Sequence, residues 1–375
     1  MRFSIAAGSS DARIALQRPV LGRSVTLMVA LLLIGLLPMW LVNVTVVQGT
    51  RDRLVDLSLT NLSARSASTA AAIDAYIQTR RREIVLVSQL PDVIAYAQHL
   101  GDQTQRDLAR AALAAAAIAS PAYESIAVLS LDGNIMAASI QTDEGTNVRF
   151  RDYFQTARIG VTFVSDPSYS VITNKPALFF SAPVKTTDGI LVGVVRSRIN
   201  LAQIWDLVEA DQGSVGTGAH SLLVDDYGIR LAVSETKGNR ANAESFIYKP
   251  IAPIDRETAQ RLATDKRFGQ TSAEQLVIDP LPELKAAIDN MPRSGTAPFR
   301  FAVGGVEQRG VATRLDSKPW VYVVAMPPNS YTEAVTAPSA GLLAGLGLAI
   351  LLAALAATWL LRSSTESAEL TRGAS

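Results

Sequence analysis

Val148–Leu201 reads VRFRDYFQTARIGVTFVSDPSYSVITNKPALFFSAPVKTTDGILVGVVRSRINL, and it holds the clearest strand and turn signals of the chain. Three runs within it are apolar and rich in β-branched or aromatic residues, a composition typical of strands. These runs are Val161–Val164, Ala177–Val184 and Ile190–Ile199. Between the last two lies Asp188-Gly189, a pair that tolerates positive φ, so the sequence predicts an antiparallel hairpin there.

The same stretch carries a group of cations. Arg196 and Arg198 are two apart on the last predicted strand, so their side chains leave the same face. Ahead of the strands, cations and aromatic rings crowd together at Arg149, Phe150, Arg151, Tyr153 and Phe154. Guanidinium groups on an otherwise apolar strand need a partner where they are buried. Our hypothesis is that this partner is a ligand.

Composition excludes several classes of function. The chain has 375 residues, a formal net charge of +1, two histidines and no cysteine. A charge so near zero gives no electrostatic argument for nucleic acid as a partner. The absence of cysteine rules out disulfides, thiolate chemistry and cysteine-bound metals. Because the sequence shows no catalytic triad, no His-Glu-x-x-His motif and no metal-ligand spacing, we expect no catalytic residue, no metal and no cofactor, and we do not expect an enzyme.

The N-terminal part predicts a membrane anchor. Residues 1–23 are polar and basic, whereas 24–47 carry no charge, and the whole chain has a positive mean hydropathy of +0.20. A helix of about 23 residues spans roughly 35 Å, enough to cross a hydrocarbon layer of ~30 Å with some tilt. The alternative is a cleaved signal peptide, but the apolar core is longer than usual and no small-x-small cleavage site follows it.

A second apolar run, at residues 339–361, predicts a second span. The basic N-terminus places both chain ends in the cytoplasm, so 48–338 are expected outside a bacterial inner membrane and 362–375 form a short cytoplasmic tail. Gly341-x-x-x-Gly345 has the small-residue spacing that lets membrane helices approach closely, and with the long helix described next it suggests a homodimer. Glycines are also simply common in membrane helices, which leaves the alternative open.

Between the spans the sequence predicts an α+β domain. Strong helix formers with apolar positions three, four and seven apart predict a long helix over about 51–100, broken or kinked at Pro91, and a second helix over Gln103–Ala119. A strand-turn-strand unit then occurs twice, at Ser125–Ser139 and Ser221–Ser234. Two copies imply two antiparallel-sheet modules, at about 101–200 and 213–335. Shorter helices are expected over Leu201–Ala210, Glu257–Thr264 and Glu283–Asn290.

Short motifs in a fixed order carry a family resemblance. They include Arg151-Asp-Tyr-Phe154, Ser165-Asp-Pro167, Ser181-Ala-Pro-Val184, Asp188-Gly-Ile-Leu-Val-Gly193, Gly216-Thr-Gly218, Asp226-Tyr-Gly228 and Pro319-Trp-Val-Tyr322. Residues from about Arg51 to Pro338 resemble the double Cache family, the PAS-like extracytoplasmic sensor domains of bacterial chemoreceptors, sensor histidine kinases and diguanylate cyclases. The resemblance implies a long N-terminal helix, a membrane-distal module that binds ligand and a membrane-proximal module that usually does not.

The resemblance also implies site residues. In the amino-acid-binding branch, an Arg-x-Trp-Tyr motif holds the ligand carboxylate, and here Arg151, Tyr153 and Phe154 stand at these positions. The aspartate that would hold the ligand's ammonium on the last strand is replaced by Arg198, and a loop acidic position by Ser170. Both replacements remove negative charge, so the expected ligand is a small anion, most simply an organic acid without an amine.

The predicted ligand-binding residues are Arg151, Tyr153, Phe154, Arg198, Lys175, Arg149 and Tyr169. Several have simpler explanations: Arg151 in a surface ion pair, Phe154 in the core and Lys175 in a solvated turn. The predicted function is a membrane-anchored small-molecule sensor that signals across the bilayer, with a separate membrane or cytoplasmic protein as a candidate signalling partner. The alternatives are a non-signalling binding or scaffold protein, or the sensor part of a longer histidine kinase or diguanylate cyclase.

Overall fold

The computed structural model describes residues 30, 33–34, 48–211, 218–240, 246–292, 295–303, 305–327, 330, 344–357 and 359. Most of the first expected span, part of the second and the whole of 362–375 lie outside these residues. Within the described ranges, no helix combines the length and the apolar character that crossing a membrane requires. The chain divides into two compact units, one made of Met1–Leu54 with Thr332–Ser375 and the other of Val55–Tyr331. The second unit contains both sheets and is described below.

Helices lead into the domain, and they break where the sequence predicts. Helix α2 (Gln48–Ser88) ends shortly before Pro91, which starts α3 (Pro91–Gln98) at a position where its missing N–H is not needed. Asp102 caps α4 (Gln103–Ile118) by accepting a 3.1 Å hydrogen bond from the backbone N–H of Gln105. The expected break at Pro91 is therefore observed.

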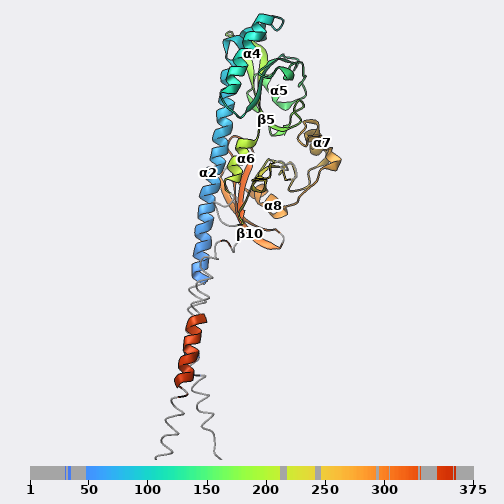
Figure 1. The fold of residues 1–375 in the computed structure, drawn as a ribbon. Helices are drawn as coiled ribbons and strands as arrows, with labels where there is room; N and C mark the ends of the chain where they lie inside the picture. The colour runs from blue at the N-terminus through green and yellow to red at the C-terminus, as the bar shows by residue number, and fades with distance from the viewer. Residues whose placement is uncertain are drawn as a thin grey trace, which may run out of the picture. The chain divides into compact units, whose positions relative to one another are not determined.

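The first module, labelled by β5 in Figure 1, is built on an antiparallel sheet in the order β2-β1-β6-β5-β3, with β4 paired to β5. Its strands are β1 (Tyr123–Leu129), β2 (Ile135–Ala138), β3 (Phe163–Val164), β4 (Ser168–Tyr169), β5 (Pro176–Lys185) and β6 (Leu191–Ile199). The 3-10 turn η2 (Gln141–Asp143) and helix α5 (Asp152–Ala157) lie between β2 and β3. The hairpin between β5 and β6 turns at Gly189, whose φ is +81°, as the sequence predicts.

The second module follows the connecting helix α6 (Ala202–Glu209) and repeats the arrangement in the order β8-β7-β11-β10-β9. Its strands are β7 (His220–Val224), β8 (Arg230–Val233), β9 (Thr296–Val303), β10 (Val306–Arg314) and β11 (Val321–Met326). Between β8 and β9 lie η3 (Ser234–Thr236), α7 (Arg256–Thr264), η5 (Ala273–Gln275) and α8 (Pro282–Asn290). The expected short helices are thus present, with bounds that differ by a residue or two.

The predicted repeat extends to single hydrogen bonds. In the first module the backbone N–H of Ile126 donates to Ser139 Oγ at 3.0 Å, and in the second the N–H of Ser221 donates to Ser234 Oγ at 3.0 Å. The turns match as well, since Gly133 and Gly228 both have positive φ, at 89° and 75°. These pairs align the two sheets residue by residue.

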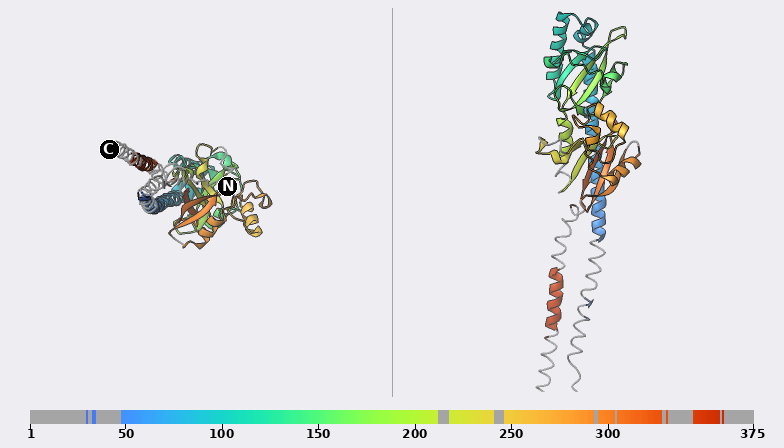
Figure 2. Two further views of the ribbon diagram at one scale, coloured as in Figure 1. Left: turned by 90° about the horizontal axis from the view of Figure 1, so that it is seen from below. Right: turned by 90° about the vertical axis from the view of Figure 1, so that its right-hand side faces the viewer.

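Both sheets pack one face against the long helix α2, which is blue in Figure 2. The helix presents Leu62, Ile73, Ile77 and Ile84, which are at most 1% exposed, at spacings that keep them on one side. The opposite face of each sheet, which we call the outer face, has its own hydrophobic cluster. Any binding site within a module must therefore lie on the outer face, because α2 fills the other one.

Candidate ligand site

The outer face of the first sheet carries two buried arginines. On β6, Arg198 lies opposite Ser125 of β1 and Phe179 of β5, and Arg196 lies opposite Ala127 and Ser181. The two arginines are 1% and 3% exposed, Arg196 being the more buried. Their side chains share one face, as their spacing predicts, and both reach the same carboxylate.

That carboxylate is Asp143, at the end of η2. Its Oδ2 atom lies 3.0 Å from Arg198 Nη1 and 3.4 Å from Arg196 Nη2, and it accepts a 2.6 Å hydrogen bond from Ser125 Oγ. Glu124 adds a 3.0 Å contact to Arg198 Nε at the rim of the site. The two replacements noted in the sequence therefore do not leave Arg198 without a negative charge, because Asp143 supplies the counter-charge from a turn far away in sequence.

Arg196 is left with donors that the chain does not satisfy. Its Nε and Nη1 atoms are buried and have no hydrogen-bond partner in the described part of the chain. Burial lowers the pKa of Arg196, and the neighbouring Arg198 adds to this effect. Because a buried donor without an acceptor is destabilising by about 1–3 kcal/mol, and more for a charged group, these atoms mark a position where an added acceptor is favourable.

Two aromatic rings pack beside the arginines of this site. Tyr153 stacks on Phe179 with ring centroids 4.8 Å apart. The guanidinium carbons of Arg151 and Arg196 lie 5.7 and 6.0 Å from the centroid of the same Phe179 ring. Burial raises the pKa of Tyr153, so its hydroxyl stays protonated and keeps its ability to donate a hydrogen bond. We call Arg151, Tyr153, Phe179, Arg196 and Asp143 the arginine cluster.

Arg151 is held by backbone rather than by a surface ion pair. It is 1% exposed, and its Nη2 donates to the carbonyl of Tyr169 at 2.5 Å. Its Nη1 donates to Ser168 Oγ at 3.3 Å and to the carbonyl of Asp265, and its Nε has no hydrogen-bond partner among the described residues. The simpler explanation of Arg151 as a solvated surface residue is thus not what the structure shows.

The other predicted residues lie around this cluster rather than in it. Phe154 is fully buried in the outer-face hydrophobic cluster, as its core-packing explanation requires. Lys175 and Arg149 are exposed. Tyr169 contributes its carbonyl to Arg151 and turns its ring toward Tyr248, at 5.3 Å between centroids. A ligand-binding role for these four residues stays a prediction.

The arginine cluster is joined to the second module by the segment after α7. The carbonyl of Asp265 accepts from Arg151, and its Oδ1 atom lies 3.6 Å from Arg151 Nη1. Two residues on, Arg267 pairs with Asp166 of the first module at 2.8 Å and with Asp225 of the second. Residues 265–267 therefore connect Arg151 to Asp225, at the end of a strand of the second sheet.

Titratable groups in this connection have shifted pKa values. Burial, with the nearby Asp152 carboxylate, raises the pKa of Asp265 to about 7. For Asp166, burial acts in the same upward direction, but Arg267 and Lys318 outweigh it and hold the pKa of that carboxyl well below its usual range. Asp166 is therefore a fixed negative charge, whereas Asp265 changes its charge near neutral pH.

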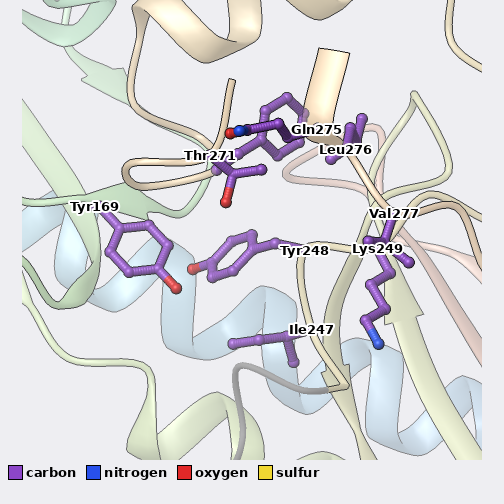
Figure 3. A pocket seen from close by; sticks show the side chains of 9 residues that line it. Tyr169, Ile247, Tyr248, Lys249, Thr271, Gln275, Leu276 and Val277 are labelled. Carbon is purple, nitrogen blue, oxygen red and sulfur yellow. The ribbon is translucent and has the colours of Figure 1, made fainter. Parts of the chain in front are cut away.

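A cavity of about 220 Å³ lies beside this connection. In Figure 3 the hydroxyl groups of Tyr169 and Tyr248 point toward one another across it, with Thr271 and Gln275 on one side. Tyr248 has a φ of +58°, which is uncommon for a residue with a bulky side chain.

In the described ranges no group of three histidine, aspartate or glutamate residues is placed to hold a metal ion.

Comparisons with known proteins agree with this architecture. The family model described as a Cache domain matches residues 50–335. No curated protein matches the chain. The fold is similar to the sensor domain of the Vibrio cholerae histidine kinase DctB, with a TM-score of 0.59 at 13% identity over 73% of this chain and 98% of that one.

A second solved structure with a similar fold is the ligand-binding domain of the Campylobacter jejuni chemoreceptor Tlp3 in complex with 4-methylisoleucine. Its TM-score is 0.52 at 12% identity, over 75% of this chain and 95% of that one. Identities this low establish a common fold and carry no information about the ligand of this chain.

Proposed function

The chain belongs to the Cache domain family, and from this premise we propose that it is a sensor whose first module binds a small organic acid without an amine. The observation that carries the proposal is Arg196, whose Nε and Nη1 donors are buried and unsatisfied beside Arg151 and Tyr153. Planar guanidinium groups bind carboxylates through paired, charge-assisted hydrogen bonds.

The charges of the site favour an anion. The buried guanidinium groups of Arg196 and Arg198 share one fully buried carboxylate, that of Asp143, and Arg198 has a second partner in Glu124 at the rim of the site. The third buried guanidinium group is that of Arg151. Asp265, the carboxyl nearest to Arg151, has a pKa raised to about 7 and so compensates that cation only in part at neutral pH. A carboxylate ligand would supply the missing acceptor and the missing charge together.

A second candidate ligand is an α-amino acid. Tlp3, which has a similar fold, has been solved with 4-methylisoleucine, and the buried Asp143 could in principle face an ammonium group. Against this, Asp143 Oδ2 already accepts from Ser125, Arg196 and Arg198. The proposal therefore favours an acid that lacks the amine.

A thermal-shift screen of the full chain in detergent tests the ligand class. Organic acids such as pyruvate, lactate and succinate should raise the midpoint, following RT ln(1 + [L]/Kd), while amino acids, putrescine and neutral sugars should not. Arg196→Met should abolish the response, and Arg300→Met, which removes an arginine that is 66% exposed in its side chain, should leave it intact. A response to amino acids alone would favour the second candidate, and a response to sugars or polyamines would refute both.

The proposal includes a membrane setting. We place the sensor domain outside the bacterial inner membrane, anchored as a homodimer by the spans expected at 24–47 and 339–361, with the signal passed across the bilayer to a cytoplasmic output. No catalysis is assigned to this chain. Because the chain lacks cysteine, single cysteines report topology cleanly.

In intact cells, an impermeant thiol reagent should label Ile118→Cys, at a side chain 84% exposed in the sensor domain. The same reagent should leave Ser367→Cys, in the expected cytoplasmic tail, unlabelled until the cells are lysed. Equal labelling of both variants in intact cells would contradict the proposed topology.

A further inference from the structure

We propose that the outer face of the second module is a second ligand site, independent of the arginine cluster, and that it takes a small uncharged molecule with an apolar body and one hydroxyl or amide group. The proposal goes beyond the organic-acid sensor proposed above. It rests on a cavity, on the side chains that line it and on two buried polar atoms among them, Gln308 Oε1 and Arg230 Nε.

The cavity has a volume of about 280 Å³ and lies on the outer face of the second sheet. Leu222 and Val233, which are register partners on β7 and β8, line it from one side. Phe301 and Gln308, which are register partners on β9 and β10, line it from the other. Phe246 and Leu281, from the segment between β8 and β9, also contribute to its wall.

The position of the cavity in the fold is that of the arginine cluster. The matched serine hydrogen bonds align Ala127 with Leu222, and these residues lie opposite Arg196 and Val323 in their own sheets. The second module therefore offers a ligand the same face of the same strand arrangement, but with the aliphatic Val323 and Ala325 at the positions of the two arginines.

Gln308 provides a hydrogen-bond acceptor in the cavity wall. The residue is 7% exposed, lines the cavity and has a buried Oε1 atom without a hydrogen-bond partner among the described residues. A buried acceptor that is left unpaired is destabilising, so a ligand that donates a hydrogen bond here gains an interaction that the chain does not make for itself.

The charged side chains around the cavity form ion pairs with one another, which favours an uncharged ligand. The buried Nε of Arg230 has no hydrogen-bond partner among the described residues, so the oxygen of a hydroxyl or amide group can also accept a hydrogen bond there. Arg230 pairs with Asp279 at 2.5 Å, and His220 lies 2.9 Å from Glu235. A charged ligand would have to break one of these pairs or bury a charge without a partner, and either is unfavourable. Ligand pockets commonly measure about 300–1,000 Å³, so this cavity suits a single ring or a short aliphatic chain.

The test uses the full chain in detergent and ligand-observed ¹⁹F NMR with 4-fluorobenzyl alcohol and 4-fluorobenzamide as neutral probes. 4-Fluorobenzoate and 4-fluorobenzylamine, which have the same ring but carry a charge, serve as the control probes. We expect saturable binding of at least one neutral probe and binding at least tenfold weaker for both charged ones. No saturable neutral binding, or equal binding of the charged probes, would overturn the proposal.

Variants show whether a probe binds in the cavity, in the detergent or at the arginine cluster. Gln308→Leu keeps the size of the side chain but removes the acceptor and should weaken neutral-probe binding about tenfold. Leu222→Trp should abolish it by filling the cavity, whereas Val306→Trp, which adds the same side chain at an exposed position of β10, should not change it. Arg196→Met should also leave it unchanged, so loss of organic-acid binding and loss of this site are distinguishable. Binding that survives both cavity variants would place the probe elsewhere.

Discussion

The two modules have the same strand order and opposite chemistry on their outer faces. At aligned register positions the first sheet has Arg196 and Arg198 on its last strand, and the second has Val323 and Ala325. Around the arginines lie Asp143 and Ser125, whereas the valine and alanine lie in an apolar cluster packed by α8. The strand arrangement thus fixes where a site can lie, and a few outer-face side chains on one strand determine its chemistry.

The largest expected effect follows from removing the counter-charge of the first sheet. Asp143→Asn leaves the buried Arg196 without a carboxylate and Arg198 with Glu124 alone, which should lower the free energy of unfolding by about 3–5 kcal/mol. Denaturant unfolding followed by tryptophan fluorescence measures the change. As a control, Asp279→Asn breaks an ion pair in which the aspartate is 53% exposed and should have an effect of about 1 kcal/mol or less. Equal effects of the two variants would show that Asp143 is not the charge partner described here.

Packing differs between the two faces of the second sheet. Leu223 is fully buried against α2, whereas Leu222 borders the 280 Å³ cavity on the outer face. Leu223→Ala should lower the free energy of unfolding by about 3–5 kcal/mol and Leu222→Ala by only about 2–3 kcal/mol, because part of the space beside Leu222 is already unfilled. If Leu222→Ala proved the more destabilising of the two, that cavity would be doubtful.

The charge balance of the first site predicts a pH dependence. The pKa of Asp265 is about 7 in the folded chain and about 4 when unfolded. Between these values the folded state holds a proton that the unfolded state has released, so this carboxyl stabilises the fold below about pH 4 and the contribution is lost as pH rises through 7. Asp265→Asn should remove this pH dependence of the free energy of unfolding. We expect the change between pH 4 and 8 to be on the order of 1–2 kcal/mol, because Asp152 shares the titration. An unchanged slope in unfolding experiments from pH 4 to 8 would assign the titration to another group.

The smallest expected effects test the alignment itself. Ser139→Ala and Ser234→Ala each remove the acceptor of one backbone N–H at equivalent positions. Each should lower the free energy of unfolding by about 1–2 kcal/mol, and the two values should agree within about 0.5 kcal/mol. Clearly unequal values would mean that the two turns are alike in geometry but not in energetics.

Local patterns in the sequence predicted most of the fold. The hairpin at Gly189, the helix break at Pro91 and the repeated strand-turn-strand units depend on residues close together in the chain, and all are present. The shared face of Arg196 and Arg198 follows from strand periodicity alone. Asp143 could not be assigned this way, because its approach to Arg198 across 55 positions depends on tertiary structure. The links from Asp265 and Arg267 to the first module have the same origin.

The segment between β8 and β9 was the least predictable part. Its two helices were expected, but the cavity walls that it supplies through Phe246 and Leu281 were not. Polar loops with several prolines carry no periodicity that indicates which side chain turns inward. Fold prediction therefore succeeded where structure is local, whereas contacts between distant segments, such as that of Asp143 with Arg198, could not be predicted from the sequence.

We propose that the arginine cluster, and not the second sheet, binds the organic acid. Isothermal titration calorimetry of the full chain in detergent tests it most directly, using the acid that gives the largest thermal shift and comparing the parent chain with Arg196→Met and Arg230→Met. Charged hydrogen bonds contribute about 1.5–3 kcal/mol, so Arg196→Met should weaken binding roughly 10–100-fold while Arg230→Met, on the second module, leaves it unchanged. Full affinity in Arg196→Met, or a loss confined to Arg230→Met, would contradict the account.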